Sequence, residues 1–173
     1  TATASYFISC GATINMNINV TFNGSSREII SGATYSIIAE SSGKALDADA
    51  WGTANGTPIQ QWTYGAGSNQ QWLLTETDSG FYTIAPSYAT TLVLDVPGWS
   101  SADGAAPTLW TNAQQNNQQW QFIRQNDYYT IVNRNSGKCL DVKGYSTEDG
   151  ATIQQYSCNG QANQRWKMTK LQD

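Results

Sequence analysis

Short runs in which apolar and polar residues alternate recur along most of this chain, and such alternation predicts half-buried β-strands. No stretch shows the apolar period of an amphipathic helix. From residue 35 onward the predicted strands come in sets of four, and the set occurs three times. Each set opens on a strand that begins with tyrosine, and these three strands span residues 35–39, 82–85 and 129–133.

Three copies of the motif Asn-Gln-x-Trp close the three sets. Their tryptophans, Trp72, Trp120 and Trp166, are 48 and 46 residues apart, which is typical of one folding unit used three times. Each set also carries a Leu-Asp pair at the end of its second strand and a glycine-rich turn before its third. Four strands in each of the repeats 35–80, 81–127 and 128–173 predict a closed all-β architecture of twelve strands.

We expect the whole Asn-Gln-x-Trp motif to lie on the fourth strand of its repeat. The tryptophans are expected in the core, because they continue an inward alternation that leads to Leu74, Phe122 and Met168. The glutamines are expected to tie loop backbone together through their amides, at Gln70, Gln118 and Gln164.

The first 34 residues do not match the repeat. Apolar side chains alternate with polar ones from Ile14 to Phe22, which predicts a half-buried strand with residues 6–10 as its partner. Two interpretations stay open, namely an extra β-ribbon packed on the repeats and the tail of a preceding β-rich module. We favour the second, because an isolated two-stranded ribbon is only marginally stable in water. The chain starts at Thr1 without a signal peptide and is interpreted as a mature or excised piece.

Composition argues against several classes of function. Only 13% of residues are charged, the net charge is −4, and the basic residues are scattered, so we expect no nucleic acid partner. No run of apolar residues is long enough to cross a membrane. The chain has no histidine, and its cysteines lack a paired zinc spacing, so we expect no metal and no cofactor. Instead it contains 15 Gln, 14 Asn, seven Trp and nine Tyr, a mixture suited to neutral, hydroxyl-rich ligands.

The three cysteines indicate in which cellular compartment the protein is found. Cys139 and Cys158 occur in the third repeat only. A disulfide between them would clip that repeat, stabilise it by roughly 3 kcal/mol in the chain-entropy model and indicate a secreted protein. Two buried free thiols are the alternative. Cys10 is left over and is buried, free or bonded to another chain.

Each repeat carries the side chains that a shallow sugar site needs. A monosaccharide offers a fan of hydroxyls and a patch of C–H groups, which suit a carboxylate, an amide and an aromatic face. In the first repeat Asp47 is followed by Gln60, Trp62 and Asn69, at offsets of 13, 15 and 22 residues. The third repeat keeps the same offsets. A purely structural role for the aspartates in bonding their own turns is the alternative.

The middle repeat departs from this set, since Thr108 stands where the amide is expected. We therefore expect two working sites rather than three. A further aromatic residue lies four positions after each aspartate, where it either forms a second wall of the site or packs against its own loop. The candidate carbohydrate-binding residues are Asp47, Trp51, Gln60, Trp62 and Asn69 in the first repeat, Asp95, Trp99, Trp110 and Asn117 in the second, and Asp141, Tyr145, Gln154, Tyr156 and Asn163 in the third.

On these motifs, residues 35–173 resemble the ricin B-chain-type lectins, also called Q-x-W lectins, and the related carbohydrate-binding modules attached to polysaccharide-degrading enzymes. All three Q-x-W tryptophans, all three Leu-Asp pairs and the placement of the cysteines agree with that family. The sequence motif Ser-Gly-Lys-x-Leu-Asp is more similar to the motifs of bacterial modules than to those of plant toxin chains. The resemblance implies a β-trefoil of three pseudo-symmetric repeats. It also implies roles for the residues of the first repeat. Asp47 accepts hydrogen bonds from sugar hydroxyls with support from Gln60, Trp62 stacks on the sugar ring, and Asn69 hydrogen-bonds a hydroxyl.

The resemblance also implies a function, which is multivalent binding of galactose-, arabinose- or xylose-type units in a polysaccharide. Such binding would target a covalently attached glycoside hydrolase to its substrate. The alternative within the family is a cell-surface glycan-binding subunit of a toxin or a haemagglutinin.

Two other classes of function compete with a lectin. Glycoside hydrolysis needs two carboxylates about 5–10 Å apart across the substrate, yet the repeated aspartates belong to three symmetry-related sites, so we expect no catalysis. A trefoil used for protein contact, such as an inhibitor, would bind no sugar, and a glycan array separates it from a lectin.

Overall fold

The computed structural model of the protein describes residues 4–7, 13–16, 28–78 and 80–172. Twelve strands, four per repeat, form one hydrogen-bonded network, and the helices of the described residues are single 3-10 turns. The all-β class and all twelve predicted strands are confirmed. The strands are β3 (Thr34–Ala39), β4 (Ala45–Ala48), β5 (Thr57–Trp62) and β6 (Trp72–Asp78); β7 (Phe81–Pro86), β8 (Leu92–Asp95), β9 (Thr108–Thr111) and β10 (Trp120–Gln125); and β11 (Tyr128–Asn133), β12 (Cys139–Val142), β13 (Ala151–Tyr156) and β14 (Trp166–Gln172).

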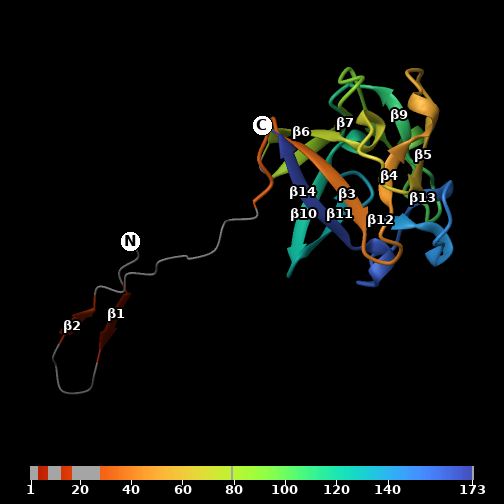
Figure 1. The fold of residues 1–173 in the computed structure, drawn as a ribbon. Coiled ribbons are helices and arrows are strands. Elements are labelled where there is room, and N and C mark those ends of the chain that lie inside the picture. The colour runs from red at the N-terminus through yellow and green to blue at the C-terminus, as the bar shows by residue number, and fades with distance from the viewer. Residues whose placement is uncertain (1–3, 8–12, 17–27, 79, 173) are drawn as a thin grey trace.

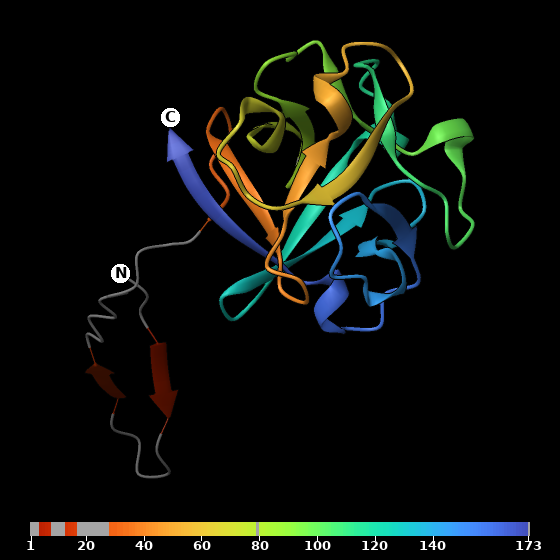
Figure 2. The same cartoon turned by 45° about the vertical axis from the view of Figure 1, so that its right-hand side comes forward.

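The first and fourth strands of the three repeats close into a barrel. Antiparallel pairing runs from β3 to β6, β7, β10, β11 and β14 and returns to β3. Figures 1 and 2 both show β14, in blue, alongside β3, in orange, so the last strand of the chain completes the ring. The second and third strands form three hairpins, β4–β5, β8–β9 and β12–β13, which pair with one another through β5. This arrangement is a β-trefoil.

The two signature motifs of each repeat are joined by a hydrogen bond in the core. Trp72, Trp120 and Trp166 are completely buried, as expected. Each indole Nε1 donates to the carbonyl oxygen of the leucine of the Leu-Asp pair in its own repeat, at 3.0 Å. Because a buried carbonyl needs a partner, this bond explains why the two motifs occur together. The residues two positions after these tryptophans were also expected to point inward, and they are buried to different extents. Leu74 is fully buried, whereas Phe122 and Met168 are partly buried against the core.

The prediction that the whole Asn-Gln-x-Trp motif lies on a strand is wrong in part. The strand starts at the tryptophan, and the asparagine and glutamine lie in the preceding 3-10 turns, η2 (Ser68–Gln70), η4 (Asn116–Gln118) and η6 (Ala162–Gln164). Successive side chains of a strand point to opposite faces. A 3-10 turn instead lets two consecutive amides reach the same carboxylate, as Asn69 and Gln70 do.

The N-terminal region contains the predicted ribbon in part. Strands β1 (Ala4–Phe7) and β2 (Thr13–Met16) pair antiparallel, with Tyr6 opposite Ile14. The expected continuation of the second strand to Phe22 lies outside the described residues, as does Cys10. The packed core of the trefoil reaches back to Ile29, which is buried among the barrel residues.

A disulfide joins Cys139 and Cys158, whose Cα atoms are 5.1 Å apart, so the alternative of two free thiols is wrong. It connects the start of β12 to the residues just after β13 and thus clips the third repeat. In the part of the chain that the structure describes, no helix has the length and apolar character needed to cross a membrane.

Candidate functional site

The residues predicted around Asp47 meet at one place, which we call the first site. Asp47 lies on β4 opposite Gln60 of β5, so the sheet register brings these side chains together. Asp47 Oδ1 accepts from Gln60 Nε2 at 3.0 Å, and Oδ2 accepts from Asn69 Nδ2 at 2.9 Å. Gln70 Nε2 adds a third bond to Oδ2, also at 2.9 Å. The partners of the carboxylate are side-chain amides rather than the backbone of its own turn.

Gln70 does more than was expected of it. Its amide ties loop backbone together as predicted, since Nε2 donates to the carbonyl of Thr63 and Oε1 accepts from the amide of Gly65. The same Nε2 also donates to Asp47. The sequence signal was available, because the glutamine follows the asparagine directly in the repeated motif.

Burial raises the pKa of the Asp47 carboxyl above its ordinary value. Hydrogen bonds from the Gln60, Gln70 and Asn69 amides oppose this rise in pKa, and the neighbouring carboxylate of Asp49 adds to it. The site therefore holds a buried carboxyl whose hydrogen-bond donors are three uncharged amides. Such a carboxylate is a strong acceptor for hydroxyl groups.

Two half-exposed tryptophans line the cavity above the carboxylate. Trp51 and Trp62 keep 49% and 45% of their surface exposed, and both line a cavity of about 440 Å³ together with Asp47, Gln60 and Asn69. Trp51 also packs against its surroundings, with its ring centroid 5.5 Å from that of Tyr88. Trp51 therefore borders the cavity and contacts Tyr88 of the middle repeat, and a role as a second wall for a bound sugar stays a prediction.

The ring at the position of Trp51 is aimed by an unusual backbone conformation. Trp51, Trp99 and Tyr145 all have φ near 56°, in the left-handed region that bulky residues rarely adopt. Strain of this kind persists where the surrounding structure imposes it, and it is concentrated at functional sites. Its occurrence at the same position of all three repeats associates these rings with the sites.

The third site, around Asp141, repeats the first. Gln154 Nε2 donates to Oδ1 at 2.8 Å, while Asn163 Nδ2 and Gln164 Nε2 donate to Oδ2 at 2.8 and 3.0 Å. Burial again raises the pKa of the carboxyl. Tyr145 and Tyr156 are exposed at the positions of the two tryptophans. The disulfide supports this site, because Cys139 lies opposite Tyr156 in the sheet.

The middle site, around Asp95, lacks the amide that Gln60 supplies at the first site. Asn117 Nδ2 donates to Oδ2 at 3.0 Å, and Gln118 Nε2 bonds the carbonyl of Thr111. Thr108 lies opposite Asp95 in the register, as expected, but its buried hydroxyl has no partner. Burial raises the pKa of Asp95 as it does at the other two sites. Trp99 and Trp110 still line a cavity of about 390 Å³ with Asp95 and Asn117.

The first site contains one acidic residue without a counterpart in the other repeats. Asp49 Oδ1 accepts from Gln60 Nε2 at 3.2 Å, and the same nitrogen donates to Asp47. Two carboxylates that share one amide lie side by side, whereas a glycosidase needs them on either side of its substrate. In the described ranges, no group of three His, Cys, Asp or Glu side chains could hold a metal ion.

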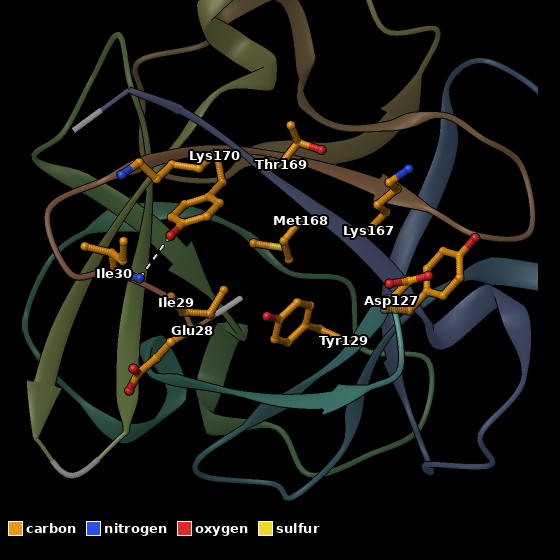
Figure 3. Close-up of a pocket in the computed structure, with 11 residues that line it drawn as sticks. Glu28, Ile29, Ile30, Asp127, Tyr129, Lys167, Met168, Thr169 and Lys170 are labelled. Atoms are coloured by element: carbon orange, nitrogen blue, oxygen red, sulfur yellow. Dashed lines mark hydrogen bonds between the residues drawn. The ribbon is translucent and has the colours of Figure 1, made fainter. Parts of the chain in front are cut away.

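A larger cavity, of about 530 Å³, lies away from the candidate sites between the N-terminal segment and β11 and β14 (Figure 3). Tyr129 and Met168 border it, and Tyr35 Oη accepts from the amide of Ile30 at 2.9 Å. None of the predicted site residues lines this cavity. It occurs once and lacks the repeated set of carboxylate, amide and ring, so its greater volume does not make it the functional site.

Comparisons with known proteins agree with this fold. Residues 33–166 match the family model described as ricin-type beta-trefoil lectin domain. A comparison with curated protein sequences finds no match.

Several solved structures are similar to the chain. The designed threefold-symmetric protein ThreeFoil is 39% identical with a TM-score of 0.78, and the match covers 80% of this chain and 99% of that one. The exo-β-1,3-galactanase 1,3Gal43A from Clostridium thermocellum is 35% identical with a TM-score of 0.78, over 83% of this chain but only 31% of the galactanase. A ricin B-like lectin from Macrolepiota procera, solved in complex with lactose, shares the fold at 24% identity and a TM-score of 0.72, over 83% of this chain and 99% of that lectin.

Proposed function

Because the chain belongs to the ricin-type β-trefoil lectin family, and is therefore a non-catalytic carbohydrate-binding domain, we propose that its first and third sites bind neutral sugar units of a polysaccharide. One observation carries this proposal. A carboxylate, three amides and two exposed rings occur together in the first and third repeats, and at the first site they line one cavity. The carboxylate and amides suit sugar hydroxyls, and the rings suit the C–H face.

The ligands that we propose are galactose-, arabinose- or xylose-type units. Among these, galactose has the support of the galactanase, a protein whose name states its action on β-1,3-galactan. The present chain matches 31% of that enzyme's length. We propose by analogy that this domain is attached to a glycoside hydrolase and holds it near its substrate. The disulfide supports a secreted location.

Several weak sites on one rigid body suit a polymer. A single shallow site that binds with a millimolar dissociation constant contributes only about 4 kcal/mol. When two such sites engage one polysaccharide chain, the second binding event is intramolecular, and the apparent affinity rises by orders of magnitude. Binding of polymers should therefore depend on both sites at once.

Removal of the exposed rings tests this proposal. Trp62→Ala and Tyr156→Ala should each weaken galactose binding at their own site by about tenfold or more, since each removes the stacking face. The double variant should lose galactan retention in affinity electrophoresis, by far more than either single variant. Ile123→Ala, at an exposed position outside the sites, is the matched control. Unchanged galactan, arabinan and xylan retention in the double variant would contradict the proposal.

Asp47→Ala is a less clean probe than Trp62→Ala. In the structure it would remove one of the two acceptors of each of three amides, at a cost of about 1–3 kcal/mol of stability where a buried donor is left unsatisfied. Loss of binding in this variant therefore needs an unfolding measurement beside it.

A further inference from the structure

Each candidate site is bordered by a loop from a different repeat. The first site borders residues 146–150 of the third repeat, the third site borders residues 100–104 of the second, and the middle site borders residues 52–56 of the first. In every case the amide of the last glycine of the loop donates to the main chain of the neighbouring site strand. These bonds are Gly150 to Gln61 at 2.9 Å, Gly104 to Gln155 at 2.9 Å and Gly56 to Leu109 at 2.8 Å.

At the first site the foreign loop is held by a buried glutamine. Gln61 Nε2 donates to the carbonyl oxygens of Ser146 and Glu148, at 2.8 and 3.0 Å. Gln61 follows Gln60, the amide that bonds Asp47. A β-carbon on Gly150 would lie 3.8 Å from both Gln60 Oε1 and the ring of Trp62. The loop therefore passes beside the stacking ring, and we call residues 146–150 the wall next to the first site.

An ionic contact fixes this wall at two of the three sites. Asp149 accepts from the amide of Thr63 at 2.6 Å and from Lys44 Nζ at 2.7 Å, which lowers the pKa of its carboxyl. At the third site Asp103 makes the same contacts with Ser157 and Lys138, at 2.8 and 2.7 Å. At the middle site Asn55 takes this position and bonds Thr111, without a lysine. The wall at the first site is thus a built feature rather than a loose loop.

The chemistry of the wall differs between the sites. Glu148 is an exposed residue of the 146–150 loop, and the loops beside the other two sites have Ala102 and Ala54 at this position. Within the first site Asp49 adds a second extra carboxylate, where the other repeats have Pro97 and Lys143. Since like charges repel at short range, the first site disfavours anionic ligand groups more than the other two.

Resting on the proposed function, we propose that the 146–150 loop and Trp62 form a second sugar subsite beside the first site, which takes an uncharged sugar unit and rejects a uronic acid unit. The Glu148 carboxylate accepts hydrogen bonds from hydroxyls of this second sugar unit, and its charge repels the carboxylate of a uronic acid unit. The third site, with Ala102 on its wall, does not discriminate between the two. An oligosaccharide at the first site therefore contacts two repeats, and only its first unit lies on Asp47.

The test uses the full chain with the other two sites disabled by Trp110→Ala and Tyr156→Ala. In this background we titrate galactose, a neutral disaccharide of two galactose units and a disaccharide of glucuronic acid linked to galactose. The neutral disaccharide should bind about fivefold more tightly than galactose, in keeping with one hydrogen bond to a charged but exposed acceptor. The uronic disaccharide should bind no more tightly than galactose.

Two variants of Glu148 assign these differences to its side chain. Glu148→Ala should reduce the affinity for the neutral disaccharide to that for galactose, with galactose binding unchanged. Glu148→Gln should admit the uronic disaccharide, because the hydrogen-bonding shape stays while the charge goes. Ala102→Glu is the converse variant. With Trp62→Ala and Trp110→Ala leaving only the third site, it should make that site reject the uronic disaccharide.

The outcomes separate the subsite from the proposed function. If the background binds galactose but Glu148→Gln leaves its preference between the two disaccharides unchanged, the subsite is wrong and the lectin site stands. If the background binds none of the three sugars, the proposed function of the first site is overturned, and the subsite with it. Glu148 is exposed, so these variants should keep the thermal unfolding midpoint of their background.

Discussion

At the scale of single residues, the site aspartates are held in an environment that disfavours their charge. Asp47, Asp95 and Asp141 are buried with amides as partners, and burial raises the pKa of each. Sequence spacing predicted the carboxylate, the rings and the asparagine of each site. It did not predict the third amide, Gln70 or Gln164, because a strand would have turned that side chain away from the carboxylate.

The raised pKa values predict opposite effects of acid on binding and on stability. As the pH falls toward about 4, these carboxylates take up protons sooner than those of an unfolded chain, whose pKa is near 3.9. Sugar affinity should fall, because the acceptors become neutral. The contribution of these three groups to the free energy of unfolding should rise in the same window, since the folded state binds the proton more tightly than the unfolded chain.

The pH dependence of stability has the opposite sign for Asp103 and Asp149. Their lysine partners lower the pKa of both carboxyls, so the stability they contribute is present above the ordinary value and is lost as the pH falls below it. Galactose titrations and thermal unfolding between about pH 3 and pH 7 check both effects. Sugar affinity that stays constant down to about pH 3.5 would argue against an ionised acceptor.

The buried tryptophans give a second prediction at this scale. Trp72→Phe should destabilise the fold by about 2–4 kcal/mol, because it leaves a cavity and deprives the Leu46 carbonyl of its donor. Trp62→Phe, at an exposed ring, is the matched control and should change stability by about 0.5 kcal/mol or less. Denaturant unfolding measures both. A loss below about 1 kcal/mol in Trp72→Phe would show that this bond is dispensable.

At the scale of elements, apolar alternation together with the repeated motifs and turn signals sufficed to place all twelve strands of the trefoil. The 3-10 turns were missed, because an element of three residues has no period that a sequence pattern can reveal. One such turn, η1 (Asp49–Trp51), follows β4 and directs the ring of Trp51 toward the first site. Its central residue, Ala50, has φ 48°, whereas the other two repeats have glycine there.

This difference predicts a pair of opposite stability effects. Gly144→Ala should destabilise the protein by about 1 kcal/mol, because alanine is strained in the left-handed region. The space around Gly144 is open, so the effect is conformational and not a clash. Ala50→Gly should raise the free energy of unfolding by a smaller amount, because the relief of backbone strain is offset in part by the greater entropy of glycine in the unfolded chain. Chemical denaturation checks the pair, and equal signs in the two variants would contradict the assignment.

At the scale of the whole molecule, threefold repetition was evident from the sequence but the sharing of sites between repeats was not. The loop at 146–150 reaches the first site through the pairing of β13 with β5, a contact between residues about 90 positions apart. Spacing within a repeat carries no information on such pairing. The loop beside each site is therefore known only from the structure. The carboxylate, the asparagine and the rings, which lie within one repeat, were predictable from the sequence.

The central claim is that sugar units dock on the exposed rings above Asp47 and leave the buried tryptophans of the core untouched. An NMR titration of the indole N–H resonances measures this directly, with galactose, arabinose and xylose as ligands. The resonances of Trp51 and Trp62 should shift and saturate at millimolar sugar, while those of Trp72, Trp120 and Trp166 stay in place. If none of the three sugars moves the Trp51 and Trp62 resonances, or if the core resonances move equally, the account of the site is wrong.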